Sequence, residues 1–153
     1  MTGRQMSPEY ANSIMYDLQK AFWDERGKGA RFRMTTVGRE YFCDKGLSQV
    51  KASSATEIVD AIGKILRDEG IVASIAHEQD DRLFRIRVQG CLHYDIEQKL
   101  VAKGVEPFTC VPANLVVMAI EEAMDRPVEL AEIKVGNASC ELLLVLFDRR
   151  QRP

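Results

Sequence analysis

Apolar residues repeat with a helical period in three segments of the chain. The first predicts an amphipathic helix over about residues 8–26, which begins with a serine N-cap and a first-turn proline. The second covers residues 54–70, where Ser54 and Glu57 form a capping box and a glycine marks the end. The third covers residues 112–124. We therefore expect three helices, each with an apolar face turned toward a core.

Between and after these helices the apolar period changes to that of strands. Residues 71–76 and 84–88 predict one hairpin, and residues 128–135 and 139–147 predict a second. A weaker helical pattern at 94–103 lies between the two hairpins. Helices followed by antiparallel hairpins, twice along the chain, are typical of an α+β domain. We expect a mostly antiparallel sheet with helices packed on one face.

Length and charge limit the classes of function. The 153 residues suit one ordinary domain with a single core, and we take residues 1–153 as that domain. Lys and Arg number 21, Asp and Glu number 23, and the net charge of −2 disfavours direct binding of nucleic acid or of an anionic membrane. No apolar run approaches the roughly 20 residues that span a bilayer, and the polar start lacks a signal-peptide segment. We expect a cytoplasmic protein.

The predicted strand 128–135 carries an irregularity. Val128 and Leu130 set one inward phase, whereas Ile133 and the residues after it set the opposite phase, so the alternation slips by one residue. A β-bulge is the simplest cause, and it would turn Glu129 and Glu132 to the same side, away from the apolar face. Two neighbouring carboxylates favour a shared proton or a bound cation. The alternative is that both are solvated acids on an exposed face.

Four cysteines lie far apart in the sequence, which favours reduced thiols or metal ligands over a disulfide framework. Cys110 precedes a predicted helix, where the dipole and free N–H groups stabilise a thiolate, although a buried structural thiol is the alternative. Cys140 lies in the same strand phase as Leu142, Leu144 and Leu146, so a buried structural thiol is the alternative for Cys140 as well. Cys91 and His93 form a Cys-x-His pair that is either a pair of metal ligands or a buried thiol beside a satisfied histidine.

Three segments of the chain together resemble a known family, the 4-vinyl reductase domain. They are residues 57–71, residues 84–90 and the closing run 126–141, and the resemblance extends over about residues 30–148. The family is described as a small-molecule or hydrocarbon-binding module that also serves as the sensory domain of aromatic-responsive transcription activators. Its fold is similar to that of the TRAPP vesicle-tethering subunits, and its members commonly dimerise. The resemblance therefore implies a homodimer that binds a small molecule.

The same resemblance implies a zinc site. The family's closing motif is a glutamate, a cysteine three residues on, a glycine four after that and a cysteine four further, with another cysteine upstream at a helix start. Its positions are matched here by Cys110, Glu129, Gly136 and Cys140. The first motif cysteine is replaced by Glu132, which leaves two thiolates and two carboxylates as ligands. Zinc accepts oxygen ligands, and Cys91 or His93 would replace a ligand if the fold brings either close.

We expect the ligand pocket between the sheet and the helices, because small-molecule sites prefer apolar concavities with a few polar groups. Its proposed lining is Phe32, Tyr41, Phe42, Phe108 and Met118. Any metal would be structural, pinning the last hairpin to the third helix.

Two other classes of function stay open. An enzyme would use Cys110 or a metal-bound water as nucleophile, His93 as base, and Glu129 or Glu132 to orient it. An adaptor similar to the tethering subunits would lack a pocket and present the first helix to a partner. The basic segment 26–39 is either a site for an anionic ligand or a solvated loop; its cations include Arg26, Lys28, Arg31, Arg33 and Arg39.

Overall fold

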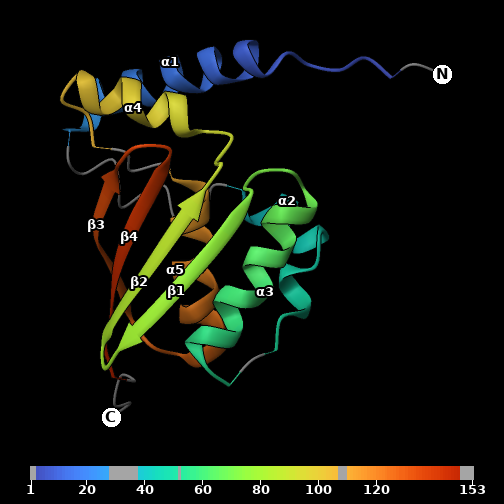
Figure 1. The fold of residues 1–153 in the computed structure, drawn as a ribbon, viewed down its shortest axis with the longest axis vertical. Coiled ribbons are helices and arrows are strands. Elements are labelled where there is room, and N and C mark those ends of the chain that lie inside the picture. Colours follow the sequence, from blue (N-terminus) through green and yellow to red (C-terminus); the bar gives the residue numbers. More distant parts are fainter. Residues whose placement is uncertain (1–2, 28–37, 52, 107–109, 149–153) are drawn as a thin grey trace.

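The structure is a computed structural model that describes residues 3–27, 38–51, 53–106 and 110–148 (Figure 1). Its helices are α1 (Pro8–Arg26), α2 (Arg39–Asp44), α3 (Ala55–Asp68), α4 (Tyr94–Ala102) and α5 (Val111–Met124), with a 3₁₀ turn, η2, at Leu47–Gln49. Its strands are β1 (Ser74–Asp80), β2 (Leu83–Gln89), β3 (Val128–Val135) and β4 (Ser139–Leu146). They form one antiparallel sheet in the order β1-β2-β4-β3. The predicted α+β class is confirmed.

Helices α3 and α5 cover one face of the sheet, and the other face is open (Figure 1). The alternation of β2 and β4 explains this arrangement, because every second side chain of each strand is fully buried against the two helices. The buried set in these strands is Phe84, Ile86, Val88, Cys140, Leu142, Leu144 and Leu146. Helices α1 and α4 lie together at one end of the sheet and share a second, smaller apolar cluster.

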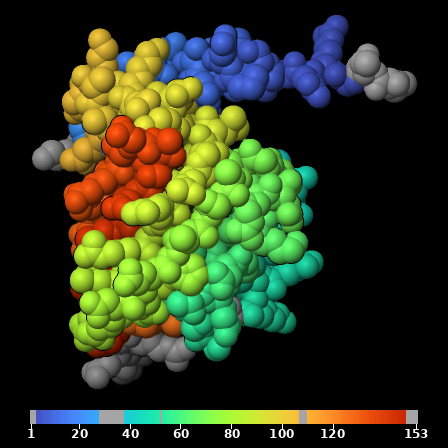
Figure 2. Space-filling model, in the orientation of Figure 1, coloured from blue at the N-terminus to red at the C-terminus, as the bar shows by residue number. Residues whose placement is uncertain are grey.

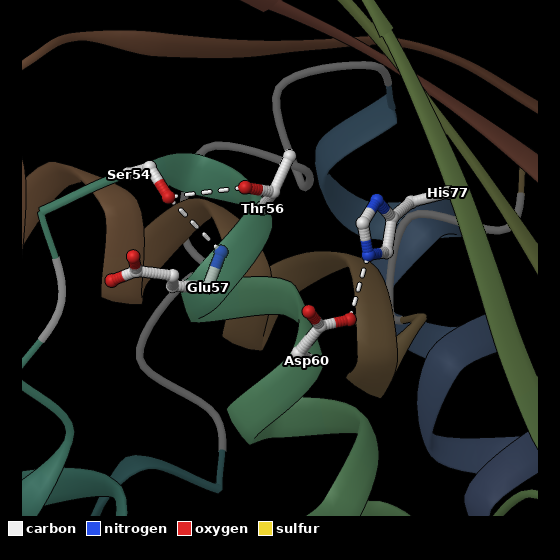
Figure 3. Close-up of polar contacts among 5 residues, drawn as sticks. All are labelled: Ser54, Thr56, Glu57, Asp60 and His77. Atoms are coloured by element: carbon white, nitrogen blue, oxygen red, sulfur yellow. Dashed lines mark hydrogen bonds and ion pairs between the residues drawn. The ribbon is translucent and has the colours of Figure 1, made fainter.

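Helix α3 begins at the predicted capping box and is tied to the sheet by a polar contact (Figure 3). The Ser54 hydroxyl accepts a hydrogen bond from the Glu57 backbone N–H at 3.3 Å. One turn later, Asp60 pairs with Nε2 of His77 in β1 at 2.7 Å. The His77 ring stacks on Phe84, with ring centroids 5.5 Å apart. These contacts hold the N-terminal part of α3 against β1 and β2.

The first strand does not begin where its apolar residues begin. Residues 71–76 were the predicted strand, but β1 covers Ser74–Asp80. The N–H groups of Ile71 and Val72 donate to the Leu66 carbonyl, so these two residues cap α3 instead of pairing in the sheet. The strand then continues into polar residues because β1 is an edge strand, whose outer positions tolerate charge.

Gly90, directly after β2, allows a close backbone approach. Its φ is 64°, and a Cβ there would lie 2.5 Å from the Cβ of Ala73. Only glycine fits both conditions without displacing the segment that leads into β1.

The predicted bulge in β3 is confirmed by a register shift between Leu130 and Glu132. Because of this shift, Glu129 lies opposite Val145 and Glu132 lies opposite Leu143, and both glutamates are exposed on the open face of the sheet. None of the described helices is both long and apolar enough to cross a membrane.

Candidate functional site

A cluster of thiols surrounds one buried carboxylate where the end of the sheet meets α4. Glu97 in α4 is only 4% exposed, and Cys140 at the start of β4 is 2% exposed. The Cys140 thiol donates a hydrogen bond to Oε2 of Glu97, with sulfur and oxygen 3.1 Å apart. Cys110, the N-cap of α5, also forms a hydrogen bond with Glu97, and Cys91 interacts electrostatically with both of the other thiols. We call these four residues the Glu97 cluster.

Burial controls the protonation of the Glu97 cluster. It raises the pKa of Glu97, although the thiol hydrogen bonds from Cys140 and Cys110 oppose this shift. Burial, reinforced by the charge of Glu97, raises the pKa of Cys140 and lifts that of Cys110 well above its ordinary value. Burial also raises the pKa of Cys91 to about 11, against a hydrogen bond from the His93 backbone. Without a bound cation, these thiols therefore stay protonated at neutral pH.

Of the two alternatives for Cys110, burial favours the structural thiol over the stabilised thiolate. An N–H group in the first turn of α5, that of Ala113, does lower the pKa of this thiol, as the helix start predicts. Desolvation of a side chain that is 4% exposed is the larger effect and acts in the opposite direction. The geometry therefore gives no support to Cys110 as an activated nucleophile.

Two buried polar atoms beside the thiols lack hydrogen-bond partners. They are Oε1 of Glu97 and Nδ1 of His93. His93 is the N-cap residue of α4, and burial lowers the pKa of its ring, which favours the neutral imidazole. An unpaired buried carboxylate oxygen costs about 1–3 kcal/mol or more unless a proton, water or cation meets it. The cluster therefore has unused capacity to accept a hydrogen bond or a cation.

The four ligands implied for zinc do not form one site. Cys110 and Cys140 lie together in the core, whereas Glu129 and Glu132 lie on the open face on the other side of the sheet. The glutamates face the same side, as predicted, but Glu132 lies 3.8 Å from Lys134 and not near a thiol. Within the described part of the chain, no group of three or more His, Cys, Asp and Glu side chains is arranged to hold a metal ion.

Glu97 is the member of the cluster that sequence reasoning missed. It follows Ile96 and precedes Leu100 on a helix whose buried residues are these three. The signal that could have identified Glu97 is its position among the apolar residues of the helix. A carboxylate is rarely buried without a partner, so an acid at such a position indicates a polar partner or a site. The weak periodicity of this segment hid that phase.

The proposed pocket residues divide into three groups. Phe42 and Met118, 5% and 6% exposed, belong to the main core between the sheet and the helices. Tyr41 is half exposed; its ring packs edge-on against Phe42, and its hydroxyl donates to Glu69. Phe32 and Phe108 lie outside the described residues, as does most of the basic segment 26–39. Two of the five proposed residues are therefore placed in the expected layer.

Strands of the sheet form part of the surface seen in Figure 2. The open face of the sheet carries a shallow groove of about 350 Å³. Alternating charges line it, among them Glu78, Arg85, Arg87, Glu132, Lys134 and Glu141. Arg87 and Glu141 pair across β2 and β4 at 2.7 Å, and Arg87 lowers the pKa of Glu141. This pattern of opposite charges is typical of a solvated sheet face.

The sequence matches no family model, and no curated protein is a significant match. The fold, however, is similar to a crystal structure of the phenol-responsive sensory domain of the transcription activator PoxR with phenol. The TM-score is 0.58 and the sequence identity is 12%, and the match covers 88% of this chain and 74% of that chain. The chain therefore shares its fold with a sensory domain of the kind that the sequence resemblance named.

Proposed function

We propose that this chain is a binding module for a small apolar or aromatic molecule, with a sensory or regulatory role. The observation that carries the proposal is the shared fold with a phenol-responsive sensory domain over 88% of the chain. The PoxR domain is phenol-responsive, and we extend that class of ligand to this chain. The thiols described above, held protonated by burial, favour binding over nucleophilic catalysis.

We place the ligand between α2 and α5, beside Phe42 and Met118. Both side chains belong to the apolar cluster between the helices and the sheet. An aromatic ring bound there would make apolar contacts with the same side chains that now pack against one another. The outer side of α2 is held by exposed polar contacts. Arg39 pairs with Glu122 of α5, and Tyr41 donates to Glu69. Exposed contacts of this kind are worth about 0–1 kcal/mol, so the main cost of moving α2 to admit a ligand is the exposure of Phe42, which is buried in the structure.

The test is isothermal titration of the full chain with phenol and with toluene. Met118→Trp fills the proposed site and should abolish binding, whereas Leu143→Trp fills the groove on the open face and should leave binding unchanged. Circular dichroism checks that each variant folds. Met118→Ala is the second core variant, and its enlarged site should shift preference toward larger aromatics. Binding that is lost only in Leu143→Trp would move the site to the open face and contradict the proposal.

A second proposal concerns a metal ion at the Glu97 cluster. We propose that a thiophilic divalent cation such as zinc is held by Cys91, Glu97, Cys110 and Cys140. These side chains would have to rearrange on binding, because the described residues contain no group of three or more such ligands already arranged to hold a metal. The unpaired Oε1 of Glu97 among three thiols supports this set, because three thiolates and a carboxylate are suitable zinc donors. Such an ion would tie β4 to α4 and α5, and would replace the protons that the thiols otherwise keep.

Elemental analysis of freshly purified protein tests the metal proposal independently of ligand binding. One equivalent of zinc in the native chain is expected, with loss in Glu97→Ala. Glu129→Ala and Glu132→Ala are the matched controls and should keep the metal, because these side chains lie on the open face. Cobalt substitution should give the charge-transfer absorption of thiolate ligands. Metal-free native protein that also fails to bind added zinc would contradict this set of ligands.

A further inference from the structure

Two of the buried polar atoms that lack a partner belong to residues one helical turn apart. In the described part of the chain, Nδ1 of His93 and Oε1 of Glu97 are enclosed without a hydrogen bond. His93 is the N-cap of α4, and the Glu97 N–H donates to its carbonyl at 3.1 Å, which closes the first turn of the helix. Side chains four positions apart lie on the same face of a helix, with Cβ atoms about 5–6 Å apart. The two unpaired atoms therefore lie within reach of one another.

The two atoms are chemically complementary. A carboxylate oxygen only accepts hydrogen bonds, whereas a neutral imidazole carries one N–H and one lone pair, so Nδ1 is a donor in one of the two tautomers. Each buried polar atom without a partner lowers stability, and one bond between these two atoms would satisfy both. Side chains on a helix lean toward its N-terminus, so the Glu97 side chain leans over the turn that His93 begins. A rotation of the His93 ring about its side-chain bonds is the movement that this contact requires.

We propose that His93 holds Glu97 in place, with the Nδ1–H of His93 donating a hydrogen bond to Oε1 of the Glu97 carboxylate. Oε2 of Glu97 then stays turned toward Cys140, whose thiol already donates to it at 3.1 Å. The backbone N–H of His93 bonds to the Cys91 thiol, so His93 contacts two members of the Glu97 cluster. His93 is thus a positioning residue for the buried carboxylate. The lone pair on Nδ1, which a metal ion or a base reaction would need, is absent in this tautomer.

Two other arrangements would use the same nitrogen atom differently. As the side chain of an N-cap residue, His93 would accept a hydrogen bond at Nδ1 from an N–H group of the first turn, but the structure has no such side-chain cap. As a metal ligand, Nδ1 would offer its lone pair to the ion. Both arrangements leave the proton on Nε2, whereas the proposed bond to Glu97 needs it on Nδ1. The position of one proton therefore separates the proposal from both alternatives.

The hydrogen bond has a consequence for the metal proposed at the Glu97 cluster. With Oε1 held by His93, the carboxylate is oriented so that Oε2 faces the thiols and any ion among them. Removing a hydrogen bond to a residue that binds a metal typically lowers metal affinity about 10–100-fold. We therefore expect His93 to strengthen zinc binding without touching the ion. This consequence rests on the proposed metal site, whereas the hydrogen bond itself needs neither a metal ion nor an aromatic ligand.

Nitrogen-15 NMR of the imidazole rings of the metal-free full chain tests the hydrogen bond. The chain has two histidines, and His77 is the internal control, because its Nε2 pairs with Asp60 at 2.7 Å. At mildly alkaline pH, where imidazoles are neutral, His93 should be the Nδ1–H tautomer and His77 the Nε2–H tautomer. Glu97→Leu should move the His93 proton to Nε2 and leave His77 unchanged, with circular dichroism as the check on folding. A native chain with the His93 proton on Nε2 would overturn the proposal, as would an Nδ1–H that persists in folded Glu97→Leu.

A matched pair of substitutions tests the positioning role. His93→Asn places an amide N–H where Nδ1 lies, whereas His93→Gln places one where Nε2 lies. In a zinc competition assay with a chromophoric chelator, His93→Gln should weaken binding about 10-fold or more, and His93→Asn should keep most of the native affinity.

The zinc-loaded chain separates a positioning residue from a ligand. Its His93 should keep the Nδ1–H signal, and loss of this signal on zinc binding would make His93 a ligand and overturn the proposal. Equal zinc affinities of His93→Gln and the native chain would contradict the positioning role. A native chain that binds no zinc would contradict the metal proposal alone, since the tautomers of the metal-free chain still decide the hydrogen bond.

Discussion

Replacing Glu97 by glutamine separates the packing of this side chain from the cost of its charge. Glutamine has nearly the same volume and still accepts the hydrogen bond from Cys140, which is 3.1 Å long in the native chain, but it does not ionise. Burial raises the pKa of Glu97, so at mildly acidic pH the folded chain keeps a proton that the unfolded chain releases. We therefore expect Glu97→Gln to remove a pH dependence of stability from metal-free protein.

The direction and size of this effect follow from proton linkage. Because the pKa is raised on folding, the contribution of Glu97 to stability is fully present below the ordinary value of 4.5 and is lost as pH rises toward the raised value. One proton gives a slope of up to about 1.4 kcal/mol per pH unit in that window. The native chain should lose stability at this rate, whereas Glu97→Gln should be flatter and more stable than the native chain at neutral pH.

The assay is urea denaturation followed by circular dichroism, from pH 4.5 to neutral pH, with chelator and a reducing agent present. Glu141→Gln is the control. Arg87 lowers the pKa of Glu141, so this exposed group contributes stability that is present above its ordinary pKa and lost as pH falls. Its replacement should therefore act in the opposite direction and only weakly. Equal pH slopes in the native chain and in Glu97→Gln would refute the reasoning.

Three further predictions concern backbone, capping and thiols. Gly90→Ala should cost about 3 kcal/mol of unfolding free energy, since it adds a clash to left-handed strain, whereas Gly104→Ala meets open space and should cost about 1 kcal/mol. Equal losses in urea denaturation would contradict this. Ser54→Ala should cost about 1 kcal/mol in the same assay, because the α3 N-cap bond is lost; an unchanged midpoint would count against the cap. In metal-free native protein, Ellman's reagent should modify the half-buried Cys43 quickly and Cys110 only on unfolding, and mass spectrometry of the modified peptides would reveal the reverse order.

The local patterns of the chain predicted most of the fold. The capping box of α3, the helical period of α1 and the slip in the phase of β3 are each specified by neighbouring residues, and the structure confirms all three. The start of β1 was predicted too early, because Ile71 and Val72 bond back to the end of α3. These two hydrogen bonds depend on the path that the chain takes after α3. A run of apolar residues looks the same in the sequence whether it caps a helix or begins a strand.

The candidate site was less predictable, because it depends on which distant segments meet. The bulge was predicted from phase alone, but phase does not say which face of the sheet the thiols occupy. Cys110 and Cys140 meet Glu97 in the core, while Glu129 and Glu132 remain on the open face. The local sequence signals only that Glu97 lies in the apolar phase of its helix. Which thiols it meets depends on the packing of α4 over the end of the sheet.

The most direct test of the central claim is an NMR titration of protein carrying ¹³C-labelled methionine methyl groups. The chain has six methionines, of which Met118 lies beside the proposed site and Met6 and Met15 lie in or beside α1. On addition of phenol, the Met118 methyl signal should shift and saturate, while those of Met6 and Met15 should stay in place. Saturating phenol that leaves the Met118 signal unmoved would contradict an aromatic site between α2 and α5.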